Sequence, residues 1–328
     1  MVDSSVSVTA SAAQAAVTPR REDDICVILN TRSGKKRQEV ARELERLFAA
    51  HSGRVDIRSL NSGREVDGAA RAAVEEGFGT IVAAGGDGTI CGIAARVAGS
   101  DSRFGVLPLG TFNYFARSLD LPEELEAAVD VVRRGDERGM GLGEVNGAAF
   151  LNNASIGAYA MILQRRERIY QRWGRSRIAA YWSVVTTLLR LRSSQRMQVS
   201  VDGETRTLRS PLIFIAANAF QLEVFNLPGG DCVEEGKFAL FVAPDRTGPA
   251  LLAYAFRLAF RGMQEGRDFT LLRGQEIVID TARKRMLVAR DGEKARMTGP
   301  FTFRYHRDAL RVIVPRATGE GEGEGEAE

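Results

Sequence analysis

A short run of glycines and polar residues, GGDGT at residues 85–89, holds the residue types that phosphate chemistry needs. It follows an apolar run and precedes a segment with helical spacing, so it predicts a turn between a buried strand and a helix. Glycines let the backbone approach a phosphate closely, and the N-terminus of the following helix favours negative charge. Asp87 would repel that phosphate unless it binds a metal ion or takes up a proton. The stretch therefore predicts a phosphate site with an acid beside it.

The same letters also fit a purely structural turn in which Asp87 caps the helix, and this alternative stays open at the level of the local pattern. The turn is not a Walker A loop, because no Gly-Lys-Ser/Thr follows, and it is not GxGxxG. A kinase that binds phosphate with this turn would therefore have a different architecture.

Histidine and cysteine usage narrows the remaining chemistry. The chain has only two histidines, His51 and His306, which argues against a histidine-based nucleophilic triad or a multi-histidine metal site. Three cysteines, Cys26, Cys91 and Cys232, lie far apart and form no CxxC pair, so neither a disulfide framework nor a zinc site is indicated. Acid–base work therefore falls to carboxylates.

The elements that must position these residues form two groups. Strand-like runs at 25–29, 54–60 and 80–89, and a further strand and loop at 103–122, alternate with helix-like segments at 35–51, 61–77, 90–99 and 123–135. This predicts a parallel sheet covered by helices. From about residue 140 the pattern changes to short strands with turns between them, which predicts a mostly antiparallel domain, interrupted by helical stretches at 161–192 and 249–264. We expect a disordered leader at 1–22, an α/β domain at 23–140, a β-rich domain at 141–316 and a disordered acidic tail at 317–328.

The composition is that of a soluble globular protein. The chain has 328 residues, of which 44% are hydrophobic and 27% charged, and this length favours two domains. Its formal net charge of +3 includes an acidic tail, GEGEGEAE, so the remainder is more basic. No apolar run is long enough to span a bilayer, and the leader lacks the apolar core of a signal peptide, so we expect a cytoplasmic protein.

Further motifs accompany GGDGT in a fixed order. NTRSGKK at 30–36 precedes it, and PLGTFNYFAR at 108–117, FLNNASIG at 150–157 and ARDGE at 289–293 follow. In order and spacing, the set resembles the diacylglycerol kinase catalytic-domain family, which includes bacterial lipid kinases and sphingosine kinases. The resemblance runs from about residue 24 to residue 315.

This resemblance implies a Rossmann-like α/β nucleotide-binding domain of the NAD kinase and diacylglycerol kinase type, a C-terminal antiparallel β-sandwich domain, and an active site in the cleft between them. Such enzymes transfer the γ-phosphate of ATP to a lipid hydroxyl with Mg²⁺. The positions expected to line the nucleotide are Asn30, Ser33, Gly34, Gly85, Gly86, Gly88, Thr89, Gly110, Thr111 and Asn113. The expected catalytic carboxylates are Asp87, Asp291 and Glu293, with Glu293 as the base. Phosphoryl transfer itself requires positioning, a cation and an acceptor for the hydroxyl proton, which agrees with this assignment.

Two positions depart from the family pattern. Tyr114 stands where the family often has an acid after Gly-Thr-x-Asn, which alters any network built on that carboxylate. Glu235, in VEEGKFALFV, stands where the family has an Asp before glycine that helps to hold a structural metal; a glutamate could still bind that metal with changed geometry.

The letters Asp-Gly-Glu occur twice. At 202–204 they lie between alternating residues, so we interpret Asp202 as part of a hairpin turn. The copy at 291–293 could form the same turn, and only its place in the ordered motif set favours a functional role.

Arginines and aromatic residues crowd the segment 161–196. Such a mixture suits an anionic membrane surface, but it equally fits solvated helices whose aromatics pack on the sandwich. We expect a lipid substrate in the membrane, peripheral membrane association through these basic helices and no nucleic-acid partner, because no nucleic-acid-binding module accompanies the arginines. The oligomeric state stays open, a homodimer included.

Three functions are compatible with these residues. The leading interpretation is an ATP-dependent lipid kinase acting on diacylglycerol or a related lipid. An NAD kinase-like enzyme shares the GGDGT turn and the two-domain plan, although PLGTFNYFAR and the C-terminal DGE favour the lipid kinase. A nucleotide-binding or lipid-binding protein without turnover is the third, motivated by Tyr114 and Glu235.

Overall fold

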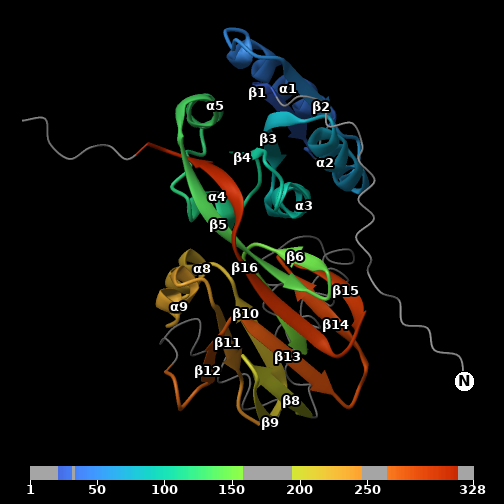
Figure 1. Cartoon of the computed structure of the whole chain (residues 1–328), viewed down its shortest axis with the longest axis vertical. Coiled ribbons are helices and arrows are strands. Elements are labelled where there is room, and N and C mark those ends of the chain that lie inside the picture. The colour runs from blue at the N-terminus through green and yellow to red at the C-terminus, as the bar shows by residue number, and fades with distance from the viewer. Residues whose placement is uncertain (1–20, 32–33, 158–193, 246–263, 317–328) are drawn as a thin grey trace, which may run out of the picture.

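The computed structural model describes residues 21–31, 34–157, 194–245 and 264–316. Residues 1–20 of the expected leader, the acidic tail, Ser33, most of the basic segment 161–196 and most of the expected helix at 249–264 lie outside these residues. The expected leader ends two residues too late, because Arg21 and Glu22 already belong to the first strand. Within the described residues, the chain folds as an α/β domain followed by a β-rich domain (Figure 1).

The first domain is built on parallel strands in the order β2-β1-β3-β4. The strands are β1 (Arg21–Leu29), β2 (Val55–Ser59), β3 (Phe78–Gly85) and β4 (Arg103–Pro108). The helices are α1 (Gly34–Phe48), α2 (Val66–Glu75), α3 (Asp87–Val97), α4 (Tyr114–Arg117) and α5 (Leu125–Arg134), with a 3₁₀ turn at Gly63–Glu65.

Alternation along β1 shows why helices cover both faces of this sheet. Val27 and Leu29 pack in one core with residues of α1 and α5, whereas Cys26 and Ile28 pack in another with residues of α2 and α3. Successive side chains of a strand point to opposite faces, so a strand that is apolar throughout needs a helix layer on each side. The loops at the carboxyl ends of β1, β3 and β4 are thereby left free for a ligand.

The second domain packs one sheet against another. Its strands are β5 (Asp136–Val145), β6 (Ala148–Phe150), β7 (Asn153–Gly157), β8 (Gln195–Val201), β9 (Glu204–Ser210), β10 (Leu212–Ala216), β11 (Phe238–Val242), β12 (Thr270–Gly274), β13 (Glu276–Thr281), β14 (Arg285–Arg290), β15 (Glu293–Thr298) and β16 (Phe301–Val314). Two short helices, α8 (Ala219–Val224) and α9 (Gly230–Glu234), lie beside them.

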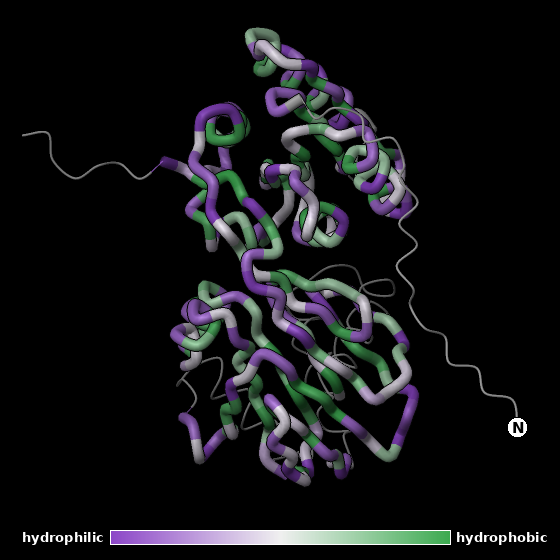
Figure 2. The backbone as a smooth tube through the Cα atoms, in the orientation of Figure 1, coloured by the Kyte–Doolittle hydropathy of each residue, from purple (hydrophilic) through white to green (hydrophobic). Residues whose placement is uncertain are grey.

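The two sheets share a hydrophobic core. In the described chain, β12-β11-β10-β7-β14-β15 form one sheet, and β16, β13, β8 and β9 form part of the other. Phe150, Phe238 and Phe303 are fully buried between the sheets, and Figure 2 shows long hydrophobic stretches on the strands of this domain. The expected fold class, an α/β domain followed by an antiparallel sandwich, is confirmed.

The link between the domains differs from the simple division expected near residue 140. β16 starts in the second core with Phe301 and ends in the first with Val314, where it pairs in parallel with β4. β5 runs antiparallel beside it, so two paired strands join the domains (Figure 1). One sheet therefore continues through both domains, because β16 adds to the edge that β4 would otherwise leave unpaired.

Candidate active site

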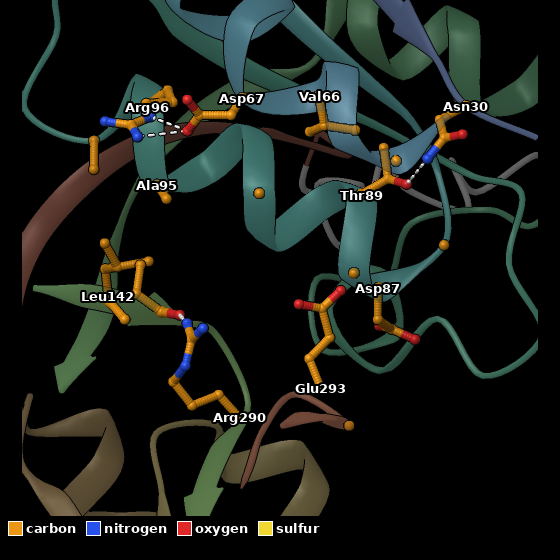
Figure 3. A pocket seen from close by; sticks show the side chains of 18 of the residues that line it. Asn30, Val66, Asp67, Asp87, Thr89, Ala95, Arg96, Leu142, Arg290 and Glu293 are labelled. Atoms are coloured by element: carbon orange, nitrogen blue, oxygen red, sulfur yellow. Dashed lines mark hydrogen bonds and ion pairs between the residues drawn. The ribbon is translucent and has the colours of Figure 1, made fainter. Parts of the chain in front are cut away.

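The turn between β3 and α3 forms one wall of the candidate site. Gly86 has extended backbone, and its carbonyl accepts hydrogen bonds from the N–H groups of Thr89 at 2.8 Å and Ile90 at 3.0 Å. Asn30, which directly follows β1, donates from Nδ2 to Thr89 Oγ1 at 2.8 Å (Figure 3). A Cβ on Gly85 would lie 2.8 Å from the Cβ of Thr89, so glycine is required there. The turn thus presents the positive end of α3 at the carboxyl edge of the sheet.

A second glycine loop, after β4, packs against this turn. A Cβ on Gly110 would lie 2.7 Å from the Cα of Gly86 and 2.5 Å from Asn113 Oδ1. The Gly110 N–H donates to Asn113 Oδ1 at 3.0 Å, and the buried Asn113 adopts a left-handed backbone (φ 49°) that asparagine tolerates. The buried side chain of Asn113 therefore holds the loop from the protein interior, whereas Gly110, Thr111 and Phe112 line the cleft.

Asp87 is the half-buried first residue of α3. Its Oδ1 accepts a long hydrogen bond from the N–H of Phe115 at 3.4 Å. Burial raises the pKa of Asp87 above its usual value; the N–H of Phe115 works against this rise, and the negative charge of Asp291 adds to it. A carboxyl group with a raised pKa in a cleft is a candidate for proton transfer.

Glu293 enters the cleft from the second domain on a two-residue hairpin. Asp291 and Gly292 join β14 to β15 with positive φ values of 45° and 83°, and Arg290 pairs with Glu293 across the turn. Arg290 and Glu293 both line the cleft (Figure 3). A Cβ on Gly88 would lie 3.3 Å from Glu293 Oε1, so the carboxylate reaches the first turn of α3.

Asp291 holds this hairpin in place. Its Oδ2 accepts a hydrogen bond from the N–H of Leu151 at 2.7 Å, and its Oδ1 accepts from the N–H groups of Asn152 at 2.8 Å and Asn153 at 3.0 Å. Unlike Glu293, Asp291 does not line the cleft. Asp291 therefore anchors the turn that carries Glu293, and its catalytic role stays a prediction.

The second Asp-Gly-Glu copy has the same turn geometry in a different place. Asp202 and Gly203 have φ values of 48° and 92°, and Val201 pairs with Glu204 across the turn. Asp202 Oδ1 accepts hydrogen bonds from the N–H groups of Gln275 at 2.9 Å and Glu276 at 2.8 Å. The prediction of a hairpin at Asp202 is confirmed, and the turn at 291–292 is both a hairpin and part of the cleft.

The walls of both domains enclose a cleft of about 1790 Å³. The expected site residues that line it are Asn30, Gly86, Asp87, Gly88, Thr89, Gly110, Thr111 and Glu293. Gly85 and Asn113 lie behind this surface and shape it, and Gly34 is the first residue of α1. The ordered motifs therefore meet at one place in the fold.

Glu235 lies apart from this cluster. It follows the last residue of α9, its side chain is 62% exposed, and its carboxylate pairs with the Lys237 ammonium at 2.8 Å. Among the described residues, no three histidine, cysteine or acidic side chains are grouped closely enough to hold a metal ion. A metal-binding role for Glu235 stays a prediction.

Tyr114, at the position of the family acid, belongs to an aromatic pair. Its ring stacks on that of Phe112 with centroids 5.8 Å apart and planes within 5°. Phe112 is 60% exposed and lines the cleft. An apolar surface therefore replaces a carboxylate at this rim.

The sequence alone did not point to several cleft residues. They are Lys36, Phe112, Arg290 and the ion pairs Asp67–Arg96 and Glu144–His306, with the latter pair 3.0 Å apart. Lys36, Phe112 and Arg290 stand inside the motifs NTRSGKK, PLGTFNYFAR and ARDGE, so their charge and apolar character were available signals. The two ion pairs join distant segments, and no local pattern announces them.

A polar contact ties the domains together beside the cleft. Asn218, which precedes α8, donates from Nδ2 to Ser118 Oγ at 3.1 Å and to Asn152 Oδ1 at 3.0 Å. Ser118 ends α4 of the first domain, and Asn152 lies in the loop that Asp291 holds. The hairpin of Glu293 is thus connected by hydrogen bonds to the loop that carries Gly110.

Several known proteins resemble this chain in sequence or fold. Residues 24–145 match the model of the diacylglycerol kinase catalytic domain. Diacylglycerol kinase of Bacillus subtilis is 37% identical over 136 residues, 40% of this chain and 45% of that protein. Diacylglycerol kinase of Staphylococcus aureus is 26% identical over 196 residues, 59% of this chain and 61% of that protein. An uncharacterized Synechocystis protein is 26% identical over 223 residues, 66% of this chain and 51% of that protein.

These alignments span about half the length of the curated relatives. A crystal structure of a diacylglycerol kinase from Bacillus anthracis shares the fold, with a TM-score of 0.65 and 16% identity over 89% of this chain and 97% of that one. Among the described residues, no helix has the length and apolarity that crossing a membrane requires. The expected resemblance is confirmed: residues 24–145 match the diacylglycerol kinase catalytic domain, within a chain that shares the two-domain fold of a solved protein of that name.

Proposed function

We propose that this protein is an ATP-dependent lipid kinase that transfers the γ-phosphate to a hydroxyl of diacylglycerol or a related lipid. One observation carries the proposal: the Glu293 carboxylate from the second domain meets the first turn of α3, where Gly88 lies. A carboxylate of the second domain that could accept a proton thus faces the glycine loops at 85–89 and 110–113 of the first domain. We call these two loops the phosphate cradle.

The first domain supplies the groups that would bind the triphosphate. The N-terminus of α3 and the adjoining glycine loops offer main-chain N–H groups at the carboxyl edge of the sheet. Lys36 lines the same cleft, and Thr89 is oriented by Asn30 at 2.8 Å. These features favour a bound polyphosphate over a neutral ligand.

The second domain supplies the proton acceptor. The lipid hydroxyl oxygen attacks the γ-phosphorus, a new oxygen–phosphorus bond forms, and the bond from that phosphorus to the β,γ-bridging oxygen breaks. ADP leaves with the electron pair of that bond, and the hydroxyl proton passes to the Glu293 carboxylate. Because Glu293 and the cradle belong to different domains, bringing the domains together would also exclude water from the phosphate.

We expect Mg²⁺ to bind together with ATP. The acidic residues fit a site in which side chains supply some of the ligands of the ion and the phosphates of ATP supply the others. The described residues contain no group of three metal ligands, but Mg²⁺ commonly takes only one or two carboxylates together with substrate phosphates. Asp87 is placed to hold such an ion, which would neutralise charge on the phosphate oxygens.

The acceptor is proposed to be reached at a membrane surface. This rests on the sequence of the segment 161–196, whose arginines and aromatics suit an anionic bilayer. Arg172→Glu combined with Arg175→Glu should then reduce cosedimentation with anionic vesicles. Unchanged cosedimentation would remove this part of the proposal.

The two Asp-Gly-Glu hairpins allow a matched test of the base. Glu293→Gln should lower label transfer from ATP to lipid by about 100-fold or more, because the proton acceptor is lost. Glu204→Gln alters the corresponding residue of the other hairpin, which is exposed, and should leave transfer unchanged. Equal activities of the two variants would exclude Glu293 as the base.

A further inference from the structure

Arg290 shares the tip of the hairpin with Glu293. The two residues pair across the Asp291–Gly292 turn, and both line the cleft (Figure 3). The Arg290 guanidinium donates from Nη1 to the main-chain oxygen of Ala149 at 2.6 Å. The second domain therefore brings a cation to the cleft together with its carboxylate.

The two carboxylates beside the phosphate cradle favour a positive side chain nearby. Asp87 and Glu293 both approach the N-terminus of α3, where the proposed function places a polyphosphate. A positive side chain near Glu293 would lessen its repulsion of the phosphates.

Of the arginines that line the cleft, Arg96 is held by a carboxylate, whereas Arg290 and Arg307 donate to main-chain carbonyls. Arg290, unlike Arg307, shares a turn with Glu293. Arg96 forms an ion pair with Asp67 at 2.5 Å, and Arg307 donates to the main-chain oxygen of Gly236 at 3.4 Å. Arg290 bonds to a neutral carbonyl, and no carboxylate of the described chain forms an ion pair with it. A guanidinium has five N–H donors, so the bond to Ala149 leaves others for a ligand.

We propose that Arg290 binds the terminal phosphate of the nucleotide, so that each domain contributes phosphate contacts. This inference rests on the proposed function and adds one residue to the site proposed there. A guanidinium binds phosphate oxygens through two parallel hydrogen bonds, which a lysine cannot reproduce. Arg290 and Glu293 would then act on the phosphate and on the incoming hydroxyl from the same rigid turn.

The competing explanation is that Arg290 only braces β6 through Ala149. The two explanations differ in what a substitution changes. A phosphate ligand affects nucleotides that carry a γ-phosphate, whereas a brace affects folding and all nucleotides alike.

The experiment compares two nucleotides by isothermal titration calorimetry with the full chain and Mg²⁺. The probes are ADP and an ATP analogue whose β,γ bridge resists cleavage. Arg290→Gln should weaken the analogue about tenfold or more and change ADP binding less than about twofold, and Arg290→Lys should fall between this variant and wild type. Arg285→Gln, at the exposed far end of β14, serves as the matched control and should change neither.

Each other outcome has a distinct meaning. Unchanged binding of the analogue, or equal weakening of both nucleotides, would overturn the role of Arg290. If Arg290→Gln fails to fold, Arg290→Lys decides, because it keeps a donor for Ala149 but loses the bidentate geometry; binding of the analogue at the wild-type level would then contradict the proposal. Wild-type protein that binds neither nucleotide would instead overturn the proposed function.

Discussion

Gly88 and Glu293 meet across the two domains: a Cβ placed on Gly88 would lie 3.3 Å from Glu293 Oε1. Gly88 belongs to the first turn of α3, and Glu293 begins β15. The contact places an acceptor for a proton beside the end of a helix that favours phosphate. A side chain at the fourth position of GGDGT would require the Glu293 carboxylate to shift.

Gly88→Ala should separate activity from stability. Alanine is favoured over glycine in a helix by up to about 1 kcal/mol, so the free energy of unfolding should stay the same or rise. The added methyl group would displace the Glu293 side chain by a few tenths of an ångström, and kcat should fall about tenfold or more. Thermal unfolding and label transfer measure the two effects; wild-type kcat would contradict the contact.

Gly110→Ala should damage the cradle itself. Its Cβ would lie 2.7 Å from the main chain of Gly86, so the two loops must move apart. We expect a loss of stability of about 1–3 kcal/mol and weaker binding of both ADP and ATP analogues. Gly147→Ala is not a fair control because its φ is 80°, whereas Gly68→Ala lies in α2 with no atom within 4 Å and should be neutral.

Asp87→Asn should stabilise the protein while lowering its activity. The pKa of Asp87 is raised in the folded state, mainly by burial, so the unfolded state ionises first as the pH rises. Stability then falls as the pH rises from the unfolded to the folded pKa, and the full penalty is present above the folded pKa. Asparagine removes this penalty and keeps an oxygen for the N–H of Phe115.

The stability gain of Asp87→Asn should therefore depend on pH. Denaturant unfolding should show a higher free energy of unfolding than wild type at pH 7. The difference should shrink as the pH falls and vanish well below the unfolded pKa of about 3.9, where both states of wild type are protonated. A variant that is less stable than wild type at pH 7 would contradict the raised pKa.

Asp291→Asn and Asp202→Asn compare the two hairpins. Each aspartate accepts main-chain hydrogen bonds, three for Asp291 and two for Asp202, so each substitution should destabilise the protein by about 1–3 kcal/mol. Only Asp291→Asn should also lower kcat, because only its hairpin carries a residue of the cleft. Equal kcat for the two variants at a temperature where both are folded would remove the positioning role of Asp291.

The sequence predicted the parts of the fold that have local signals. Every residue of β1 from Ile25 to Leu29 is apolar, which indicated a strand buried on both faces. The Asp-Gly pairs indicated hairpins. The ordered motifs indicated which loops would meet. These signals depend on residues close together in the chain.

Other features depend on contacts between distant residues and had no such signal. The return of β16 to the first domain follows from its pairing with β4, about 200 residues earlier. The contact between Glu144 and His306, 3.0 Å apart, and the hydrogen bond between Asn218 and Ser118 likewise join separate segments. The sequence also did not show that Asp291 accepts main-chain hydrogen bonds whereas Glu293, two residues later, lines the cleft.

The central claim is transfer of the γ-phosphate of ATP to a lipid hydroxyl. It is tested most directly by incubating the full chain with γ-labelled ATP, Mg²⁺ and mixed micelles of diacylglycerol, monoacylglycerol, ceramide, sphingosine or phosphatidylglycerol, with NAD as a soluble acceptor. The account predicts label in diacylglycerol or another of these lipids, and its loss in Glu293→Gln but not in Glu204→Gln. Label in NAD alone, or no labelled lipid from protein that binds ATP, would contradict it.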